Sequence, residues 1–223
     1  MTITDPLAGT PLALAPTPDG MVGLGIAEMA YIASRGTSDA ATLSRDFLGL
    51  NPPDDQVAFL GASALTARGF LTGRGTDELE VRSSAALLQI ALGTATRWTR
   101  IGVLAREADP AVVYLVQTPE LAALIEPAAL ASWWLSFTDD PTVTPRLITE
   151  LLLGRLEANP EVACIVDSRD LTAIRHNLLV TRAADGELTV SVDVEPGGEG
   201  GTPTDIPAGG LLELVTALMT DAS

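Results

Sequence analysis

The sequence contains no lysine, one histidine (His176) and one cysteine (Cys164), and only 4% of its residues are aromatic. Without a lysine amine the chain cannot form a Walker A phosphate loop, a Schiff base or a pyridoxal-phosphate site. One histidine and one cysteine are too few for the usual zinc ligand sets. A single cysteine forms no internal disulfide, which fits a reducing compartment. These absences favour binding over catalysis.

The two rare residues lie outside any catalytic motif. His176 follows Arg175 beside a predicted hairpin. The chain has no Gly-x-Ser-x-Gly sequence, so a surface position of His176 is favoured over a role in a Ser-His-Asp triad. Cys164 lies in the apolar run 162–166, which predicts a buried structural thiol. The Asp-x-Asp-x-Asp-Gly calcium loop is absent. We expect no enzyme, no cofactor and no metal, with a carboxylate-dependent enzyme as the lesser alternative.

The charge is strongly one-sided, with 13 arginines against 29 acids and a net charge of −16. This balance opposes binding to nucleic acid and to anionic membranes, both of which need basic residues. It keeps a chain that is 47% hydrophobic in solution, and an acidic face for a basic partner is the alternative interpretation. The uncharged runs are too short to span a bilayer, and the N-terminal stretch lacks a positive region. We expect a cytoplasmic monomer or homodimer.

The first part of the chain is predicted to be helical. Residues 1–20 are rich in Pro, Thr and Ala and predict a flexible arm, and 21–223 are expected to form one α+β domain. Within 21–76, three helices are predicted: one with Leu24 to Ile32, one capped by Ser38, and one opened by Asp54-Asp55.

The segment Arg68-Gly69-Phe70-Leu71 ends the third predicted helix and turns into an extended stretch. Three helices followed by such a turn resemble a winged helix. The third helix carries no basic residue before Arg68, so a structural or protein-binding winged helix is favoured over a DNA-binding one. A DNA-binding version remains open at this point.

The rest of the chain predicts two similar parts, 77–138 and 144–223. The predicted elements are a helix over 77–92, strands over 98–106 and 111–117, a helix over 118–125, an apolar segment over 130–137, a helix from Thr144, a strand over 162–166, a hairpin over 177–182 and 187–195, a Gly-rich loop over 196–203 and a helix over 211–219. We interpret this order as helix–hairpin–helix repeated once. The repeat predicts a central antiparallel sheet with pseudo-twofold symmetry, flanked by helices. The alternative is coincidence, because Asp-Pro and Asp-Gly turns are common in α+β proteins.

Trp133, Trp134 and Phe137 gather much of the aromatic surface of a chain that has little. Core packing is the simple interpretation. Because tryptophan is enriched at interface hot spots, the three are also the candidate partner-binding residues.

The order of elements resembles the EspG family of type VII secretion chaperones of actinobacteria. The similarity lies in the helical N-terminal region, the Ala-Leu-x-x-Arg-Gly-Phe-Leu segment (64–71), the following leucine-rich helix, the paired hairpins and the Ile-Pro-Ala step into a closing helix (206–219). The chain is short for that family, has a Gly-rich loop at 197–201, and shows no evident N-terminal strand.

The resemblance implies a central antiparallel sheet with quasi-twofold symmetry and a cytosolic, non-enzymatic protein. It also implies a helical partner with an apolar tip, of the PE–PPE type. We therefore expect a chaperone or adaptor, with an acidic winged-helix regulator or assembly module as the alternative.

Overall fold

The computed structural model describes residues 18–74, 78–104, 111–128, 131–172, 175–183, 186–193 and 201–220. The predicted arm falls almost entirely outside these residues. The tips of both predicted hairpins and most of the Gly-rich loop also lie outside them.

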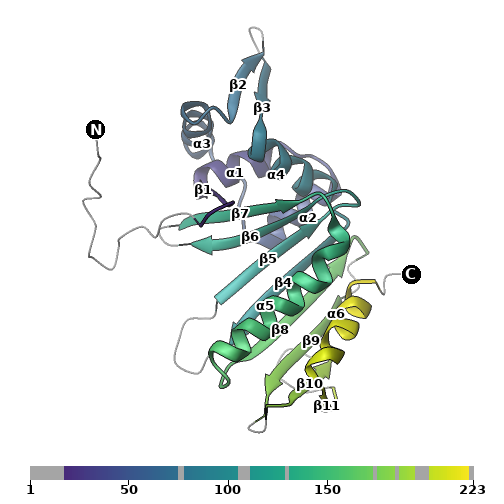
Figure 1. The fold of residues 1–223 in the computed structure, drawn as a ribbon. Coiled ribbons are helices and arrows are strands. Elements are labelled where there is room, and N and C mark those ends of the chain that lie inside the picture. The colour runs from purple at the N-terminus through teal and green to yellow at the C-terminus, as the bar shows by residue number, and fades with distance from the viewer. Residues whose placement is uncertain are drawn as a thin grey trace, which may run out of the picture. The chain divides into compact units, whose positions relative to one another are not determined.

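The chain is a mixed α+β protein, which confirms the predicted fold class (Figure 1). Its large antiparallel sheet contains nine strands in the order β1-β7-β6-β5-β4-β8-β9-β10-β11, and β2 pairs with β3 in a small second sheet. Two compact units are distinguished by their internal packing. The first comprises Met1–Ala95 and Ala123–Phe137, and the second Thr96–Ala122 and Thr138–Ser223. This division does not test the predicted single domain over 21–223.

The first unit holds four helices among its described residues. Its elements are β1 (Val22–Gly25), α1 (Ile26–Ser34), α2 (Asp39–Leu48), α3 (Asp55–Ala67), β2 (Leu71–Arg74), β3 (Glu78–Val81), α4 (Ser83–Thr94), β6 (Ala122–Ala128) and β7 (Ser132–Thr138). The predicted caps are confirmed. The Ser38 hydroxyl accepts from the Ala41 amide, and Asp54 accepts from the Val57 amide. Gly49 ends α2 at φ 66°, a left-handed conformation that suits glycine.

Close helix packing organises this unit. Helix α1 lies against α3, where Gly61 leaves no room for a Cβ beside the Ala27 carbonyl. Helix α2 is tied to the end of α4, because the Ser38 and Ser44 hydroxyls donate to the Gly93 and Leu92 carbonyls at 2.7 and 2.8 Å. Helix α3 fully buries only Gly61 and Leu65, and its Phe59 and Leu60 are exposed.

Three of the sequence-based expectations are wrong. The chain has an N-terminal strand, β1, which pairs with β7. The helix predicted from residue 77 begins only at Ser83, because 78–81 form β3 and pair with β2. The helix predicted over 118–125 is a turn followed by β6. There the Thr118 hydroxyl accepts from the Glu120 and Leu121 amides, as an N-cap would, but within a turn.

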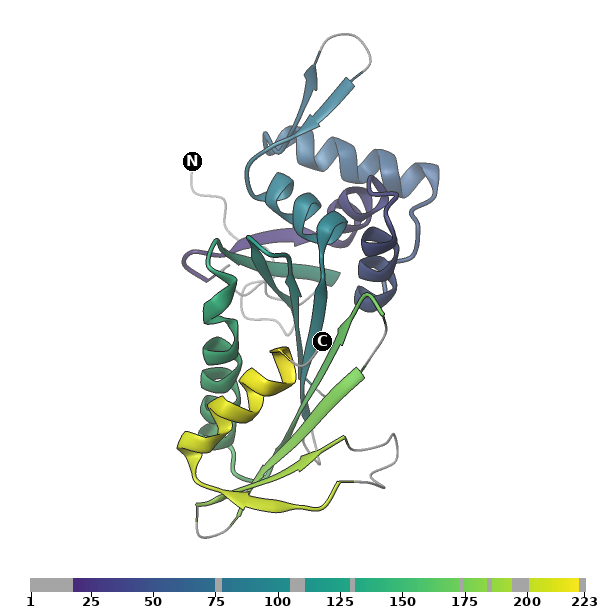
Figure 2. The same ribbon diagram turned by 90° about the vertical axis from the view of Figure 1, so that its right-hand side faces the viewer.

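The second unit is a sheet with helices on one face. Its elements are β4 (Arg97–Leu104), β5 (Ala111–Gln117), a short 3-10 turn (Pro141–Val143), α5 (Thr144–Ala158), β8 (Ala163–Asp170), β9 (Arg175–Arg182), β10 (Leu188–Val192), β11 (Thr204–Ile206), a second 3-10 turn (Ala208–Gly210) and α6 (Leu211–Thr220). Figures 1 and 2 show α5 and α6 side by side on the same face of β4, β8 and β9.

The order of elements recurs, although in a different form from the predicted helix–hairpin–helix. Helix α4 is followed by four strands, β4 to β7, and α5 is followed by four more, β8 to β11. The first strands of the two sets, β4 and β8, pair antiparallel over eight residues. An antiparallel pair between corresponding strands is what a twofold relation requires, so the order fits the predicted pseudo-twofold plan.

Candidate functional site

The sheet of the second unit has two unequal faces, because successive side chains of a strand point to opposite sides. Along β8, Cys164, Val166 and Ser168 are buried, whereas the intervening Ile165 and Asp167 are half-buried. The buried set faces α5 and α6, and we call this side the covered face. We call the other side the open face, since neither described helix of this unit lies on it. It is open only in part, because Trp98 and Val116, which share this side, are fully buried.

The covered face is a packed core with a small polar inset. Buried side chains from both helices meet buried strand residues: Ile148, Leu152, Leu156, Leu211, Val215, Ile101, Leu115, Val166, Leu178, Val180 and Val190. Arg97 enters at one end and donates to the Ser168 hydroxyl and to the Leu218 carbonyl, both at 3.3 Å. Burial lowers the pKa of the Arg97 guanidinium, an effect that Asp170 partly offsets.

The open face carries an apolar row across four strands. The register places Val112, Gly102, Ile165 and Leu179 side by side on β5, β4, β8 and β9. Ile165 lies over Gly102, where an added Cβ would come within 2.9 Å of the isoleucine Cγ2. The missing side chain at Gly102 thus lets Ile165 lie flat across the middle of the face. Val112, Ile165 and Leu179 are half-buried, so each retains some exposed surface.

A polar row lies next to the apolar one. Tyr114, Arg100, Asp167 and Asn177 are neighbours in the same register. Arg100 Nη2 and Asp167 Oδ2 form an ion pair at 2.9 Å, with side chains that are 49% and 21% exposed. An arginine and a tyrosine beside an apolar strip are the residue types that dominate protein-binding hot spots.

The cysteine and the histidine of the chain both lie on the covered side of the sheet and not on the open face. The Cys164 thiol points to the covered face, and burial raises its pKa to about 11, so it is a poor nucleophile at neutral pH. His176 Nδ1 lies 3.6 Å from an Asp193 carboxylate oxygen on the covered side of the sheet. Among the described residues, no group of three or more His, Cys, Asp or Glu side chains is arranged to hold a metal ion.

A hollow of about 360 Å³ lies at one end of β8 and β9, lined by Pro160, Glu161, Val162, Ala163, Thr181 and Arg182. Glu161 is the one carboxylate among these lining residues. A carboxylate-dependent enzyme needs two such groups with separated pKa values, so the hollow gives that alternative no support.

The predicted partner-binding aromatics lie in the first unit and are not brought together. On β7, Trp133 is buried, and Trp134 points to the opposite side of the strand. Trp134 and Phe137 are half-buried. Trp133 is therefore part of the core, and only Trp134 and Phe137 keep some surface.

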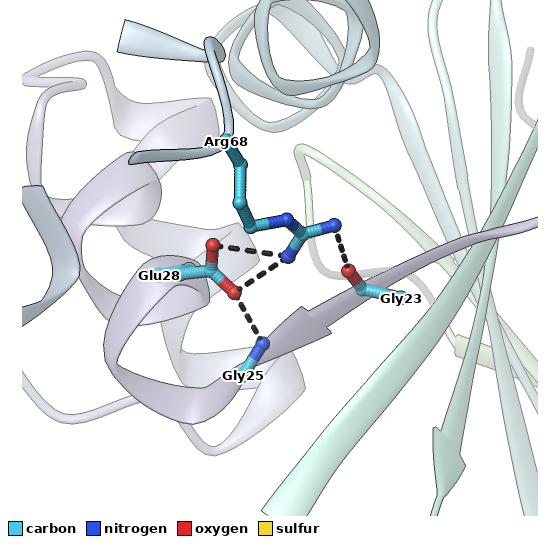
Figure 3. A network of polar contacts seen from close by, with 4 residues as sticks. All are labelled: Gly23, Gly25, Glu28 and Arg68. Carbon is cyan, nitrogen blue, oxygen red and sulfur yellow. Dashed lines mark hydrogen bonds and ion pairs between the residues drawn. The ribbon is translucent and has the colours of Figure 1, made fainter. Parts of the chain in front are cut away.

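The Arg68 of the Ala-Leu-x-x-Arg-Gly-Phe-Leu segment has a structural role. Arg68 Nη1 donates to both oxygens of Glu28 at 3.0 Å, and Arg68 Nη2 donates to the Gly23 carbonyl at 2.7 Å (Figure 3). Glu28, only 7% exposed, also accepts from the Gly25 amide at 2.7 Å. The Arg68 guanidinium covers the Phe70 ring at 4.9 Å. The network ties the end of α3 to β1 and the start of α1.

Sequence reasoning missed the open face entirely. Its apolar members lie in runs such as Val162–Val166 where every residue is apolar, so alternation gives no contrast between faces. Two charged residues were the available signal for this face. Arg100 lies inside one predicted strand, and Asp167 directly follows another.

Neither a scan against models of known protein families nor a search of curated proteins finds a match to this chain. Within the described part of the chain, no helix has both the length and the hydropathy needed to cross a membrane.

Proposed function

We propose that this chain is a non-enzymatic cytoplasmic adaptor or chaperone that binds an apolar helical segment of a partner protein on its open face. The observation that carries the proposal is the apolar row Val112–Gly102–Ile165–Leu179 beside the Arg100–Asp167 pair. An apolar helix laid on this row removes the half-buried side chains from water, at roughly 25 cal/mol per Å² of apolar surface.

The resemblance to the EspG family gives the partner a concrete form. A type VII secretion substrate of the PE–PPE type would present an apolar helical tip, which matches an apolar strip with polar groups at its border. The net charge of −16 keeps the adaptor soluble while its binding face is empty.

The test is co-expression of the chain with proteins encoded beside its gene, followed by pull-down. Leu179→Asp places a charge in the apolar row and is expected to reduce the retained partner at least tenfold. The matched control is Leu212→Asp, the same change at a leucine of α6 that is 41% exposed. Circular dichroism checks that both variants fold. If no partner is retained, or if both variants retain it equally, the proposal is wrong.

An acidic winged-helix regulator or assembly module is the second candidate, favoured by the order α1-α2-α3 followed by the β2–β3 hairpin. Its DNA-binding version requires binding that weakens as salt rises, measured at moderate ionic strength. We expect none, because α3 opens with two aspartates and carries no basic residue.

A further inference from the structure

Helix α3 presents two large apolar side chains to solvent. Phe59 is 72% exposed and Leu60 is 52% exposed. The buried residues of the helix, Gly61 and Leu65, lie on the side that packs against α1. With 3.6 residues per turn, Phe59, Leu60 and the intervening positions of Gln56 and Ser63 form the opposite, outward side. We call this outward side the α3 patch.

The charged residues at the start of α3 are acidic. No Arg, Lys or His occurs between Arg45 and Arg68, while Asp54 and Asp55 stand exposed at the start of the helix. Arg68, at the far end, is held by Glu28, the Gly23 carbonyl and the Phe70 ring. The patch is therefore apolar at its centre and negative at one end, with no cation on the helix itself.

We propose that the α3 patch docks a basic amphipathic helix of a partner protein. Apolar side chains of that helix would cover Phe59 and Leu60, and its Lys or Arg residues would meet Asp54 and Asp55. Phe59, which is 72% exposed, offers a large apolar ring as the anchor of this contact. A second copy of this chain fits less well, because its α3 brings no basic residue to these aspartates. This surface lies in the first unit and is independent of the open face in the second.

The experiment uses a synthetic amphipathic helical peptide of leucine and lysine, and a matched peptide with glutamate in place of lysine. A fluorophore attached through Ser63→Cys reports binding at the patch itself, since the natural Cys164 is buried. The lysine peptide is expected to bind and change the fluorescence, and the glutamate peptide is not. Rising salt is expected to weaken binding, because ions screen the aspartates.

Phe59→Asp is expected to weaken the lysine peptide about tenfold or more, as interface anchors do when replaced. If charge attraction alone held the lysine peptide, Phe59→Asp would bind it more tightly, since this variant is more negative. Leu212→Asp adds the same charge at an exposed leucine in the other unit and should leave binding unchanged. Leu60→Asp provides a second variant of the patch.

Three results would overturn the proposal. Equal effects of Phe59→Asp and Leu212→Asp would show that the peptide binds without the patch. Equal binding of the glutamate peptide would show that the partner does not have to be basic. Self-association in sedimentation that Phe59→Asp abolishes would make a second copy the occupant. Since Leu179→Asp tests the other face, failure here leaves the function proposed above intact.

Discussion

The covered and open faces of the second unit are built from alternate residues of the same strands, yet they differ in what they can do. On β9, Leu178 is 1% exposed against α5 and α6, whereas its neighbour Leu179 is half-buried on the open face. On β4, Arg97 caps a helix from the covered side, and Arg100 makes an exposed ion pair on the other. The covered face holds the core of this unit, whereas Val112, Ile165 and Leu179 on the open face keep part of their surface exposed.

The largest expected contrast is between two leucines that are adjacent in sequence. Leu178→Ala removes buried methyl groups and leaves a cavity between sheet and helices, which should lower the free energy of unfolding by about 2–4 kcal/mol. Leu179→Ala, the same change on the open face, should cost about 1 kcal/mol or less, since its surroundings include solvent. Urea unfolding followed by circular dichroism measures both. Equal losses would mean that the two faces are equally covered.

The helix caps at Ser38, Gly49 and Asp54 were predictable because each depends on residues within one turn of the helix. The four residues of β1 carry two glycines and no strand signal, and they are extended because β7 pairs with them. The helix predicted over 118–125 is wrong because a threonine hydroxyl that accepts from the following amides starts either a helix or a turn. Local chemistry is the same in the two cases, and only pairing decides between them.

The candidate site was less predictable than the fold. Whether Ile165 or Val166 meets the helices depends on where α5 and α6 pack, and both residues are β-branched and apolar. The three aromatic residues were candidates because aromatic residues are rare in this chain, but Trp133 is buried. Exposure is a property of packing over long sequence distances, which a motif of adjacent residues does not encode.

Thiol reactivity can compare the covered and open faces at two neighbouring positions of β8, 164 and 165. Burial raises the pKa of Cys164 to about 11, against 9.0 for a free thiol, so its thiolate fraction at neutral pH falls roughly a hundredfold. In Ile165→Cys, the new thiol on the open face should react quickly with a thiol reagent while Cys164 reacts at least a hundredfold more slowly.

The rate at Cys164 should continue to rise with pH up to about 11, while the rate at position 165 levels off earlier. The raised pKa also means that stability present below pH 9 is lost as the pH rises through about 11, because the unfolded thiol ionises more readily. In denaturant both thiols should react at once, which is the control. Fast labelling of Cys164 in the native protein would contradict the assignment of the covered face.

The smallest contrast concerns the two arginines of β4. Arg97→Ala leaves the Leu218 carbonyl without this donor and should cost about 1 kcal/mol of stability, since the two bonds are long. Arg100→Ala breaks an exposed ion pair and should cost about 0–1 kcal/mol, less at high salt. Urea unfolding at low and high salt separates the two variants.

Because Arg100 borders the apolar row, its loss should weaken the partner complex more than it weakens the fold. An Arg97→Ala variant that loses the partner while Arg100→Ala retains it would reverse the roles of the two faces.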